Sequence, residues 1–378
     1  MKMEQLQWTP DSWKRTRGET LGEAADLVLA FGSREAISIV ENFQYLRREF
    51  PNANILSCSS SGEILGSRVW DDTISATAIQ FANVQMEICQ VRVDNTSESL
   101  AAGKRLVSKI PSENLKWILV LSDGNKVNGS ELLKGIHTNL QIDVPVTGGL
   151  AGDADRFQKT LVGINEAPKE GNIIAIAFYG DKLKIGHGSV GGWDPFGPER
   201  LITKSKQNVL YELDGKSALE LYKKYLGPEA EQLPSSALLF PLSIKLANNP
   251  DPIVRTILTI DEKEQSMTFA GDMPEGVYAR LMRANFDRLI DAASFAANKS
   301  LNQLQGPPEL ALLISCVGRK LVLGQRVDEE VESIENLFGK RTYLTGFYSY
   351  GEISPMVRSG TCELHNQTMT ITTLSEEE

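Results

Sequence analysis

A pattern of strand, helix, strand and glycine–acid turn occurs three times along this chain. An internal repeat of this kind indicates a fold that is built from one structural unit used several times. Each copy starts with a short apolar run, continues through helically spaced apolar residues and ends at a turn in which glycine precedes an acid. The three starts read "DLVLAFGS" from Asp26, "WILVLSDG" from Trp117 and "ELALLISCVG" from Glu309. The three turns read "SCSSSGEI" at 57–64, "PVTGGLAGD" at 145–153 and "YLTGFYSYGE" at 343–352. We therefore expect an α/β fold in which one unit is used three times.

Local signals set the limits of the helix in two of the copies. In the first copy, Ser33 can act as an N-cap and Pro51 ends the helical pattern, which predicts one helix over 34–50. In the third copy, Gly339 follows the helical pattern and can cap its C-terminus. Both signals support the strand–helix–strand order of the unit.

The number of strand-like segments predicts mixed sheets, because it exceeds what a doubly wound parallel sheet requires. At 378 residues the chain is long for one hydrophobic core, so we expect two domains. The segment "GHGSVGGWDPFGPE" at 186–199 is rich in glycine and proline, which predicts an irregular junction between them. The predicted organisation is an N-terminal extension over 1–24, a first domain over 25–199 and a second domain over 200–378.

Composition argues against two classes of partner and favours one compartment. The formal net charge is −10 and Lys and Arg form no cluster, whereas nucleic acid and anionic membranes require a positive field. The N-terminus lacks the apolar stretch of a secretion signal, and no apolar run is long enough to span a membrane. The cysteines show no paired spacing, which fits reduced thiols; they are Cys58, Cys89, Cys316 and Cys362. We expect a soluble, cytoplasmic protein.

The repeated turn is the first candidate for a ligand site. Glycine at the end of a strand permits positive φ and has no Cβ, so backbone amides can face a small ligand. The acid that follows can accept hydrogen bonds from an ammonium or hydroxyl group. A turn that serves structure alone, with its acid in solvent, would carry the same residues. The predicted ligand-binding residues of the turns are Ser60, Gly62, Glu63, Gly152, Asp153, Ser349, Gly351 and Glu352. We expect these residues to line a shared cleft.

Three further residues are candidates outside the turns. Cys316 ends a predicted buried strand three residues before Arg319, and a positive neighbour can lower the pKa of a thiol and make it reactive. The alternative is that Cys316 acts only as a small buried hydrophobic residue. Arg319 could bind a ligand carboxylate, and His187 could contact a ligand held between the domains. The histidines are scattered and no phosphate-binding or nucleophile motif occurs, so we expect neither a metal nor a cofactor.

The chain resembles the FIST family, sensory proteins that pair a FIST N-terminal domain with a FIST C-terminal domain. The resemblance covers about residues 26–374 and rests, in order, on "SCSSSGEI", "PVTGGLAGD", "GHGSVGGWDPFGPERLITKSKQNVLYELDGKSALELYKKYLG", "CVGR" and "GFYSYGEISP". It implies a module of signal transduction that senses small ligands, amino acids among them, and it brings no established catalytic residues. Larger relatives attach kinase, cyclase, chemotaxis or F-box domains. The residues before the first strand are too few for another domain, so we expect output through a partner protein.

Three functions follow from these observations. The leading hypothesis is a stand-alone sensor that binds a small polar metabolite, with the acidic turns facing an ammonium group and backbone amides or Arg319 facing a carboxylate. The second is an enzyme with Cys316 as nucleophile and a turn carboxylate as acid or base. The third is a protein-interaction scaffold. The leading hypothesis predicts a small-molecule ligand and a signalling partner protein.

Overall fold

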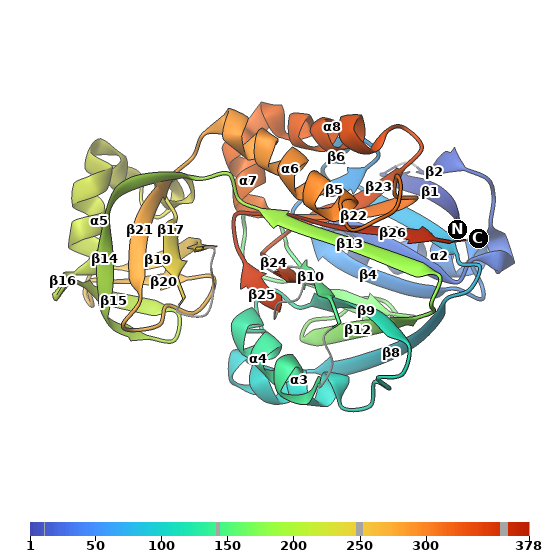
Figure 1. Cartoon of the computed structure of the whole chain (residues 1–378), viewed down its shortest axis with the longest axis horizontal. Coiled ribbons are helices and arrows are strands. Elements are labelled where there is room, and N and C mark those ends of the chain that lie inside the picture. Colours follow the sequence, from blue (N-terminus) through green and yellow to red (C-terminus); the bar gives the residue numbers. More distant parts are fainter. Residues whose placement is uncertain (11, 141–143, 247–251, 356–361, 378) are drawn as a thin grey trace.

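The computed structural model describes residues 1–10, 12–140, 144–246, 252–355 and 362–377. Three sheets form a core, and a smaller domain with a fourth sheet projects from one end of it (Figure 1). The chain ends lie together at the opposite end, where the Met1 nitrogen is 2.9 Å from Glu309 Oε1 and 3.6 Å from Glu376 Oε2. Both ends of the chain therefore belong to the core. Within the described ranges, no helix has both the length and the apolar character needed to cross a bilayer.

The first repeat unit builds one sheet of the core. Its elements, with those that join the same sheet, are β1 Lys2–Thr9, β2 Ser12–Gly18, β3 Leu27–Ser33, α1 Arg34–Ser38, α2 Val40–Glu49, β4 Asn54–Ser60, β7 Ile74–Gln80 and β11 Val162–Ile164. The strand order is β11-β4-β3-β7-β1-β2, with β3 parallel to β4 and antiparallel to β7. Residues of the N-terminal extension form the β1–β2 hairpin, which widens this sheet by two strands.

The predicted helix over 34–50 is interrupted. Ser33 is its N-cap as expected, because the Ser33 hydroxyl accepts a hydrogen bond from the Ala36 amide. The helix stops at Ile39, whose backbone is extended, and resumes as α2. The Asn42 side chain donates to the Ala36 carbonyl at 3.0 Å and so occupies an acceptor that a continuous helix would use. The expectation of one continuous helix was therefore wrong.

The second repeat unit builds the next sheet. Its elements and sheet partners are β8 Gln85–Arg92, α3 Ser99–Val107, β9 Leu115–Ser122, α4 Gly129–Asn139, β10 Val146–Leu150, β12 Asn172–Tyr179, β24 Gly351–Pro355 and β25 Cys362–His365. The strand order is β25-β24-β10-β9-β12-β8. As in the first unit, the first strand, β9, is parallel to the second, β10, and antiparallel to the last, β12. The helices α3 and α4 pack together on the outer face (Figure 1).

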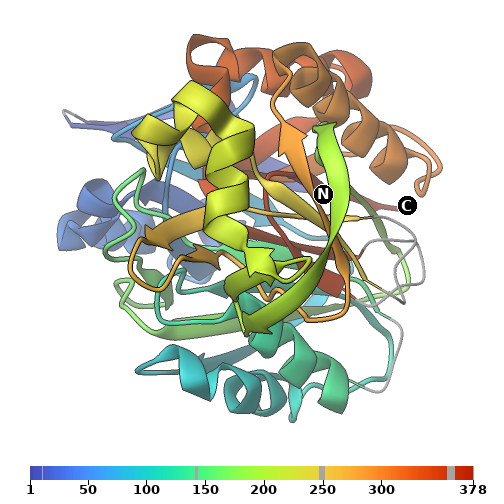
Figure 2. The ribbon, with the colours of Figure 1, turned by 90° about the vertical axis from the view of Figure 1, so that its left-hand side faces the viewer.

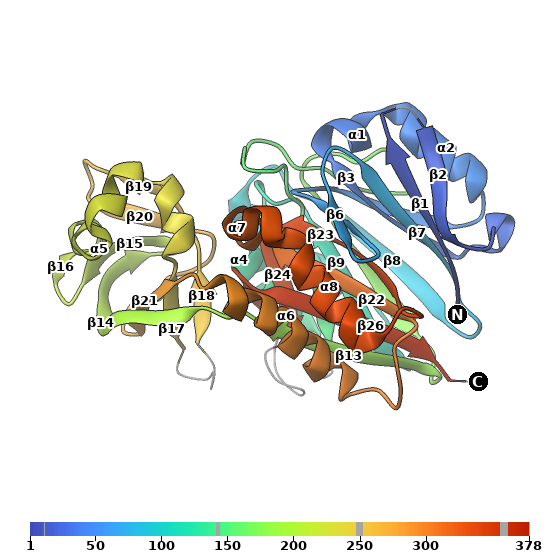
Figure 3. The same ribbon diagram turned by 90° about the horizontal axis from the view of Figure 1, so that it is seen from above.

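The third repeat unit completes the core. Its elements and sheet partners are β5 Glu63–Leu65, β6 Arg68–Trp70, β13 Leu183–Val190, α6 Phe286–Leu301, β22 Leu310–Cys316, α7 Val317–Leu323, α8 Val327–Phe338, β23 Tyr343–Ser349 and β26 Met369–Glu376. The order is β13-β26-β22-β23-β5-β6. Figure 3 shows α6 and α8 side by side over this sheet. Gly339 caps α8 with φ of 85°, as the sequence predicts. One unit used three times in mixed sheets is thus confirmed.

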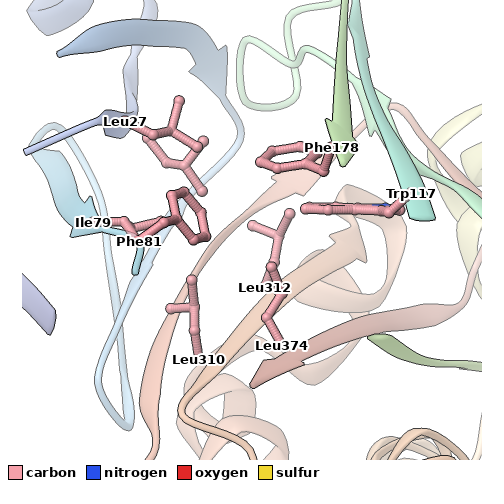
Figure 4. A pocket seen from close by; sticks show the side chains of 9 residues that line it. Leu27, Ile79, Phe81, Trp117, Phe178, Leu310, Leu312 and Leu374 are labelled. Atoms are coloured by element: carbon pink, nitrogen blue, oxygen red, sulfur yellow. The ribbon is translucent and has the colours of Figure 1, made fainter. Parts of the chain in front are cut away.

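The inner faces of the three sheets share one hydrophobic core. Alternate residues of each first strand point into it, because side chains of a strand alternate between its two faces; they are Leu27, Leu29 and Phe31, then Trp117, Leu119 and Leu121, then Leu310, Leu312 and Ile314. Figure 4 shows the small gap that remains between leucine, isoleucine and aromatic side chains from all three units. Its volume of about 10 Å³ and apolar lining leave no place for a polar ligand.

The smaller domain is inserted between the second and third units. Its elements are β14 Asp194–Lys206, β15 Val209–Leu213, β16 Lys216–Ser217, α5 Ala218–Leu226, β17 Leu242–Lys245, β18 Ile253–Arg255, β19 Ile257–Asp261, β20 Ser266–Phe269 and β21 Tyr278–Arg283. We call it the inserted domain; it has its own hydrophobic core, and it stands in front of the core in Figure 2. The third unit follows it in sequence but packs with the first two, and the expected domain limit at 199 falls inside β14.

The glycine-rich segment 186–199 is largely regular rather than irregular. β13 and β14 include all of it except residues 191–193. Gly188 of β13 lies against α6 so closely that a Cβ would be 2.1 Å from the Ala296 carbonyl oxygen. The glycine at this position therefore allows a helix to approach a strand, and its presence does not indicate a loop.

Candidate functional site

Each glycine–acid turn sends the chain out of its own sheet and into a neighbouring one. After the first turn, β5 pairs with β23 of the third unit. After the third turn, β24 pairs with β10 of the second unit, and after the second turn, β11 pairs with β4 of the first. The exchange closes a ring through the three units. The repeated turn is therefore the element that joins the three sheets.

The three turns contact one another at the centre of this ring. Backbone hydrogen bonds link them in sequence: Ser61 N to Tyr348 O at 2.8 Å, Gly152 N to Ser59 O at 3.0 Å, and Tyr350 N to Leu150 O at 3.1 Å. A Cβ on Gly152 would lie 2.3 Å from Ser61 Oγ, so only glycine fits there without displacement. We call this region the turn junction. The structure brings the predicted turn residues together in it, packed against one another.

The Glu63 carboxylate is used inside the first unit. It is buried and accepts hydrogen bonds from the hydroxyl of Ser60, from Thr73 N at 3.2 Å and from Thr73 Oγ1 at 2.8 Å. Thr73 immediately precedes β7, so the carboxylate ties the turn to the start of the unit's last strand. Burial raises the pKa of Glu63 to about 7.

Glu352 repeats this arrangement in the third unit. It accepts from Ser349 Oγ at 2.8 Å, from Thr368 N at 3.2 Å and from Thr368 Oγ1 at 2.9 Å, and Thr368 precedes β26. Burial raises the pKa of Glu352 to about 8. Two turns thus carry the same carboxylate–hydroxyl network, and both of their acids titrate near neutral pH.

Asp153 of the second turn binds groups from all three units. Arg34 Nη1, at the start of α1, donates to its carboxylate at 3.0 Å, and the Tyr350 hydroxyl of the third turn donates to the same side chain. Backbone amides of Gln158 and Lys159 complete its partners at 3.2 and 2.9 Å. Asp153 is therefore a structural link between turns in this conformation.

Arg319 is fully buried beside the third turn. Its Nη2 lies 2.7 Å from Glu330 Oε2, and neither side chain has any exposed area. The remaining guanidinium donors reach the carbonyl oxygens of Gly191 at 2.5 Å and Leu289 at 2.7 Å. A ligand carboxylate would have to replace this ion pair in order to bind Arg319.

Cys316 is also buried, with 2% of its surface exposed. Burial and the nearby Glu352 carboxylate raise the pKa of the thiol well above its ordinary value, although Arg319 acts in the opposite direction. The effect of burial exceeds that of the positive neighbour, which disfavours the thiolate that a nucleophile requires.

Alkylation of the native protein by iodoacetamide should be fastest at Cys89. Cys89 lies half-buried on the edge strand β8, whereas the other three thiols are buried. Peptide mass spectrometry at pH 8 measures the rate at each site, and urea-unfolded protein, in which all thiols are accessible, serves as the control. Faster reaction at Cys316 than at Cys89 would contradict this expectation and support the enzyme hypothesis.

His187 lies away from the turn junction. It occupies β13 opposite Thr372, and its backbone carbonyl accepts from Gln303 Nε2 at 2.7 Å. With Lys116 and Lys184, among others, it lines a surface cavity of about 330 Å³. Among the described lining residues of this cavity, His187 is the one that the sequence predicts as a site residue.

A cavity of about 160 Å³ lies between the inserted domain and the core, and the sequence did not reveal it. The core contributes Ser130, Leu133, Lys134 and His137 from α4, and Cys362 and Glu363 from β25; the inserted domain contributes Ile244, Leu246, Arg255, Asp272 and Pro274. We call it the interdomain cavity. The α4 residues recur at helical spacing, which marks one face of that helix. No local pattern links them to the segments on the opposite wall.

The interdomain cavity contains both signs of charge. Arg255 is 3% exposed and donates to Leu364 O at 2.7 Å and to Asp272 O at 3.3 Å. Burial lowers the pKa of Arg255 to about 10 and raises the pKa of Glu363. The Asp272 carboxylate is paired with Lys134 at 2.9 Å. Among the described residues, neither Arg255 nor Glu363 forms an ion pair.

Sequence comparison places this chain among proteins of known domain type. A FIST N domain model matches residues 26–216, and a FIST C domain model matches residues 218–355. An uncharacterized protein of Methanocaldococcus jannaschii is 23% identical over 365 residues, which cover 88% of this chain and 66% of that protein. An uncharacterized protein of Mycobacterium tuberculosis is 23% identical over 249 residues, 63% of each. The chain therefore spans slightly less than two thirds of the length of these relatives.

Solved structures show weak similarity over most of the chain. Cyanuric acid hydrolase from A. caulinodans is 8% identical, with a TM-score of 0.35 and coverage of 94% of this chain and 91% of that one. A second cyanuric acid hydrolase structure is 8% identical with a TM-score of 0.34. The two domain models together match nearly the whole chain, and the protein belongs to the FIST family, whose domains are ligand-sensing modules of signal transduction.

Proposed function

We propose that this protein is a cytoplasmic sensor that binds a small polar metabolite, with amino acids as the favoured class, and signals through a partner protein. The observation that carries the proposal is the interdomain cavity, in which a buried guanidinium and a carboxylate face a space of about 160 Å³ without an ion-pair partner among the described residues. A space of this size, below the roughly 300–1,000 Å³ of most ligand pockets, would admit only a small metabolite.

The position of the cavity supports a mechanism for signalling. Its walls belong to two bodies, the core and the inserted domain, which are connected by polar contacts across the cavity. Lys134 on α4 pairs with Asp272, and Arg255 donates to Leu364 of β25. A ligand that contacts both walls would favour one relative position of the two bodies, and a partner protein could read that change.

The turn junction is the second candidate for the ligand site. Its serine, glycine and acidic residues are the ones that the sequence predicts, and Glu63, Glu352 and Asp153 are concentrated there. Their carboxylates are already bonded to protein donors, so we propose that these residues principally hold the three sheets together. The variants Leu246→Trp and Glu63→Gln distinguish ligand binding at the interdomain cavity from binding at the turn junction.

A thermal-shift screen of the purified protein against the amino acids and a panel of common metabolites should give at least one raised melting temperature. A ligand at 100 times its Kd adds about 2.7 kcal/mol to the free energy of unfolding. Leu246→Trp fills the interdomain cavity and should abolish the shift, whereas Leu337→Trp, at an exposed leucine of α8, should retain it.

Glu63→Gln serves as the test of the turn junction. A shift that persists in Leu246→Trp and disappears in Glu63→Gln would place the ligand at the turns. A screen in which no compound raises the melting temperature would contradict the sensor function and favour the scaffold.

A further inference from the structure

Phe295 is the centre of an unusually exposed face of α6. Of the large hydrophobic side chains in the described part of the chain, Phe295 has the largest exposed fraction, 62%. The opposite face of α6, with Ala293 and Ala297, is packed against the third sheet and α8, and Figure 3 shows no further element over the outer side of the helix. Single exposed apolar side chains are common on protein surfaces, so the meaning of this one depends on the residues around it.

Two opposite charges lie at equal distances from Phe295 along α6. Asp291 is four residues before it and Lys299 four residues after it, and both are exposed. Residues four apart lie on the same face of an α-helix about one turn from each other, so the ring is placed between an acid and a base. Within the described residues, neither Asp291 nor Lys299 forms an ion pair, whereas Arg288 on the same helix is paired with Asp194 at 3.0 Å. The two charges beside Phe295 are therefore available to a partner.

This pattern is complementary to itself under a twofold rotation. When a second α6 is placed antiparallel to the first, with the rotation axis through the Phe295 ring, Lys299 of one protomer lies opposite Asp291 of its partner. The same pair forms again on the other side of the axis, and the two rings meet at the centre. Twofold contacts use one patch on both subunits and so require such self-complementarity. An unrelated partner would not require the acid and the base to be equally distant from the ring.

We propose that the outer face of α6 is the contact between two copies of this chain in an antiparallel twofold dimer. Phe295 packs against Phe295 of the partner subunit, and two Asp291–Lys299 ion pairs flank the rings. This contact is independent of the proposed ligand site, and it adds an interaction surface to the sensor. One helix from each protomer buries less than the roughly 1,200–2,000 Å² of stable complexes, so we expect a weak dimer that dissociates on dilution.

Sedimentation equilibrium of the full chain, over a hundredfold range of protein concentration, measures this association. The average mass should rise from the monomer towards the dimer as the concentration increases, and added salt should weaken the dimer because it screens the exposed ion pairs. Phe295→Glu places two like charges at the axis and should keep the protein monomeric over the same range. Val40→Glu, at a 49% exposed position on α2, is the matched control and should associate like the wild type.

Charge reversal tests the antiparallel arrangement itself. Asp291→Lys leaves only basic residues on both sides of the ring, and Lys299→Glu leaves only acidic ones, so each variant alone should associate about tenfold more weakly than the wild type. An equal mixture of the two variants should associate more tightly than either alone, because every contact across the axis then joins opposite charges. The double variant Asp291→Lys with Lys299→Glu should also recover association. All of these side chains are exposed, so the melting temperatures should match the wild type.

Three outcomes would overturn the proposal. A protein that remains monomeric at every concentration would refute the dimer. A dimer that Phe295→Glu does not weaken would show that another surface forms the contact. A mixture of the two charge variants that associates no more tightly than each alone would refute the antiparallel pairing of Asp291 with Lys299. None of these results bears on ligand binding in the interdomain cavity, so they leave the sensor function to its own test.

Discussion

Replacing Glu330 by alanine should lower the free energy of unfolding of the core by about 3–5 kcal/mol. The substitution leaves the Arg319 guanidinium buried without its counterion, because both side chains of this pair have no exposed area. It also removes the acceptor for Ser315 Oγ at 3.3 Å and for the Tyr348 hydroxyl, which connect α8 to β22 and β23. Urea unfolding followed by tryptophan fluorescence reports on the core, since no tryptophan lies within residues 194–283.

The adjacent residue of α8 is the control for this prediction. Glu329 pairs with Arg326 at 2.8 Å on the surface, where solvent screens the interaction, so Glu329→Ala should cause a much smaller loss. The double variant Arg319→Met with Glu330→Leu removes both charges and should recover the part of the loss that comes from the unpaired guanidinium. Equal losses at Glu329 and Glu330 would show that the buried pair is not an important source of core stability.

The free energy of unfolding should fall as the pH is raised from 6.5 to 8.5. The folded-state pKa is about 7 for Glu63 and about 8 for Glu352, against an ordinary value near 4.5. The folded state therefore binds a proton at each carboxyl more tightly than the unfolded state does. The resulting contribution to the free energy of unfolding is complete below pH 4.5 and is lost as the pH rises through the two folded-state pKa values. With about 1.4 kcal/mol per pKa unit, both carboxyls together give a loss of about 3 kcal/mol in this window.

The window begins at pH 6.5 because His365 acts in the opposite direction below it. Burial lowers the pKa of His365 to about 4, so protonation of the unfolded chain favours unfolding between pH 4 and 6.5. Glu63→Gln combined with Glu352→Gln should flatten the dependence above pH 6.5, because an amide occupies the same space and cannot ionise. Glu41→Gln, at an exposed position of α2, should leave the slope as in the wild type. A double variant that keeps the full slope would mean that other groups cause it.

Much of the fold could be predicted because each repeat unit consists of residues that are contiguous in the sequence. The apolar runs at 27–33, 115–122 and 310–316 are buried strands, and the alignment of the three turns matches their position in the sheets. Where prediction failed, a distant or side-chain contact was responsible. The Asn42 side chain bonds the Ala36 carbonyl where the first helix is interrupted, and pairing with β26 makes part of the glycine-rich segment a strand whose glycines let α6 approach.

The candidate site also has a part that the sequence predicts and a part that only tertiary contacts supply. The turn residues could be identified from their recurrence, but the burial of Glu63 and Glu352 depends on Thr73 and Thr368, which belong to the following strands. From the sequence, Arg319 is predicted to be available to a ligand carboxylate. In the structure α8 packs beside it, and Arg319 forms an ion pair with Glu330 instead.

By itself, the sequence determined the thrice-used unit, the glycine–acid turns and the family, since periodicity and motifs are properties of neighbouring residues. The tertiary structure alone decided that the third unit shares a core with the first two across an inserted domain. It alone brought α4, β25 and the inserted domain around one cavity, whose wall residues lie as far apart in the sequence as Ser130, Arg255 and Glu363. Packing, rather than any local pattern, sets which of these distant side chains meet.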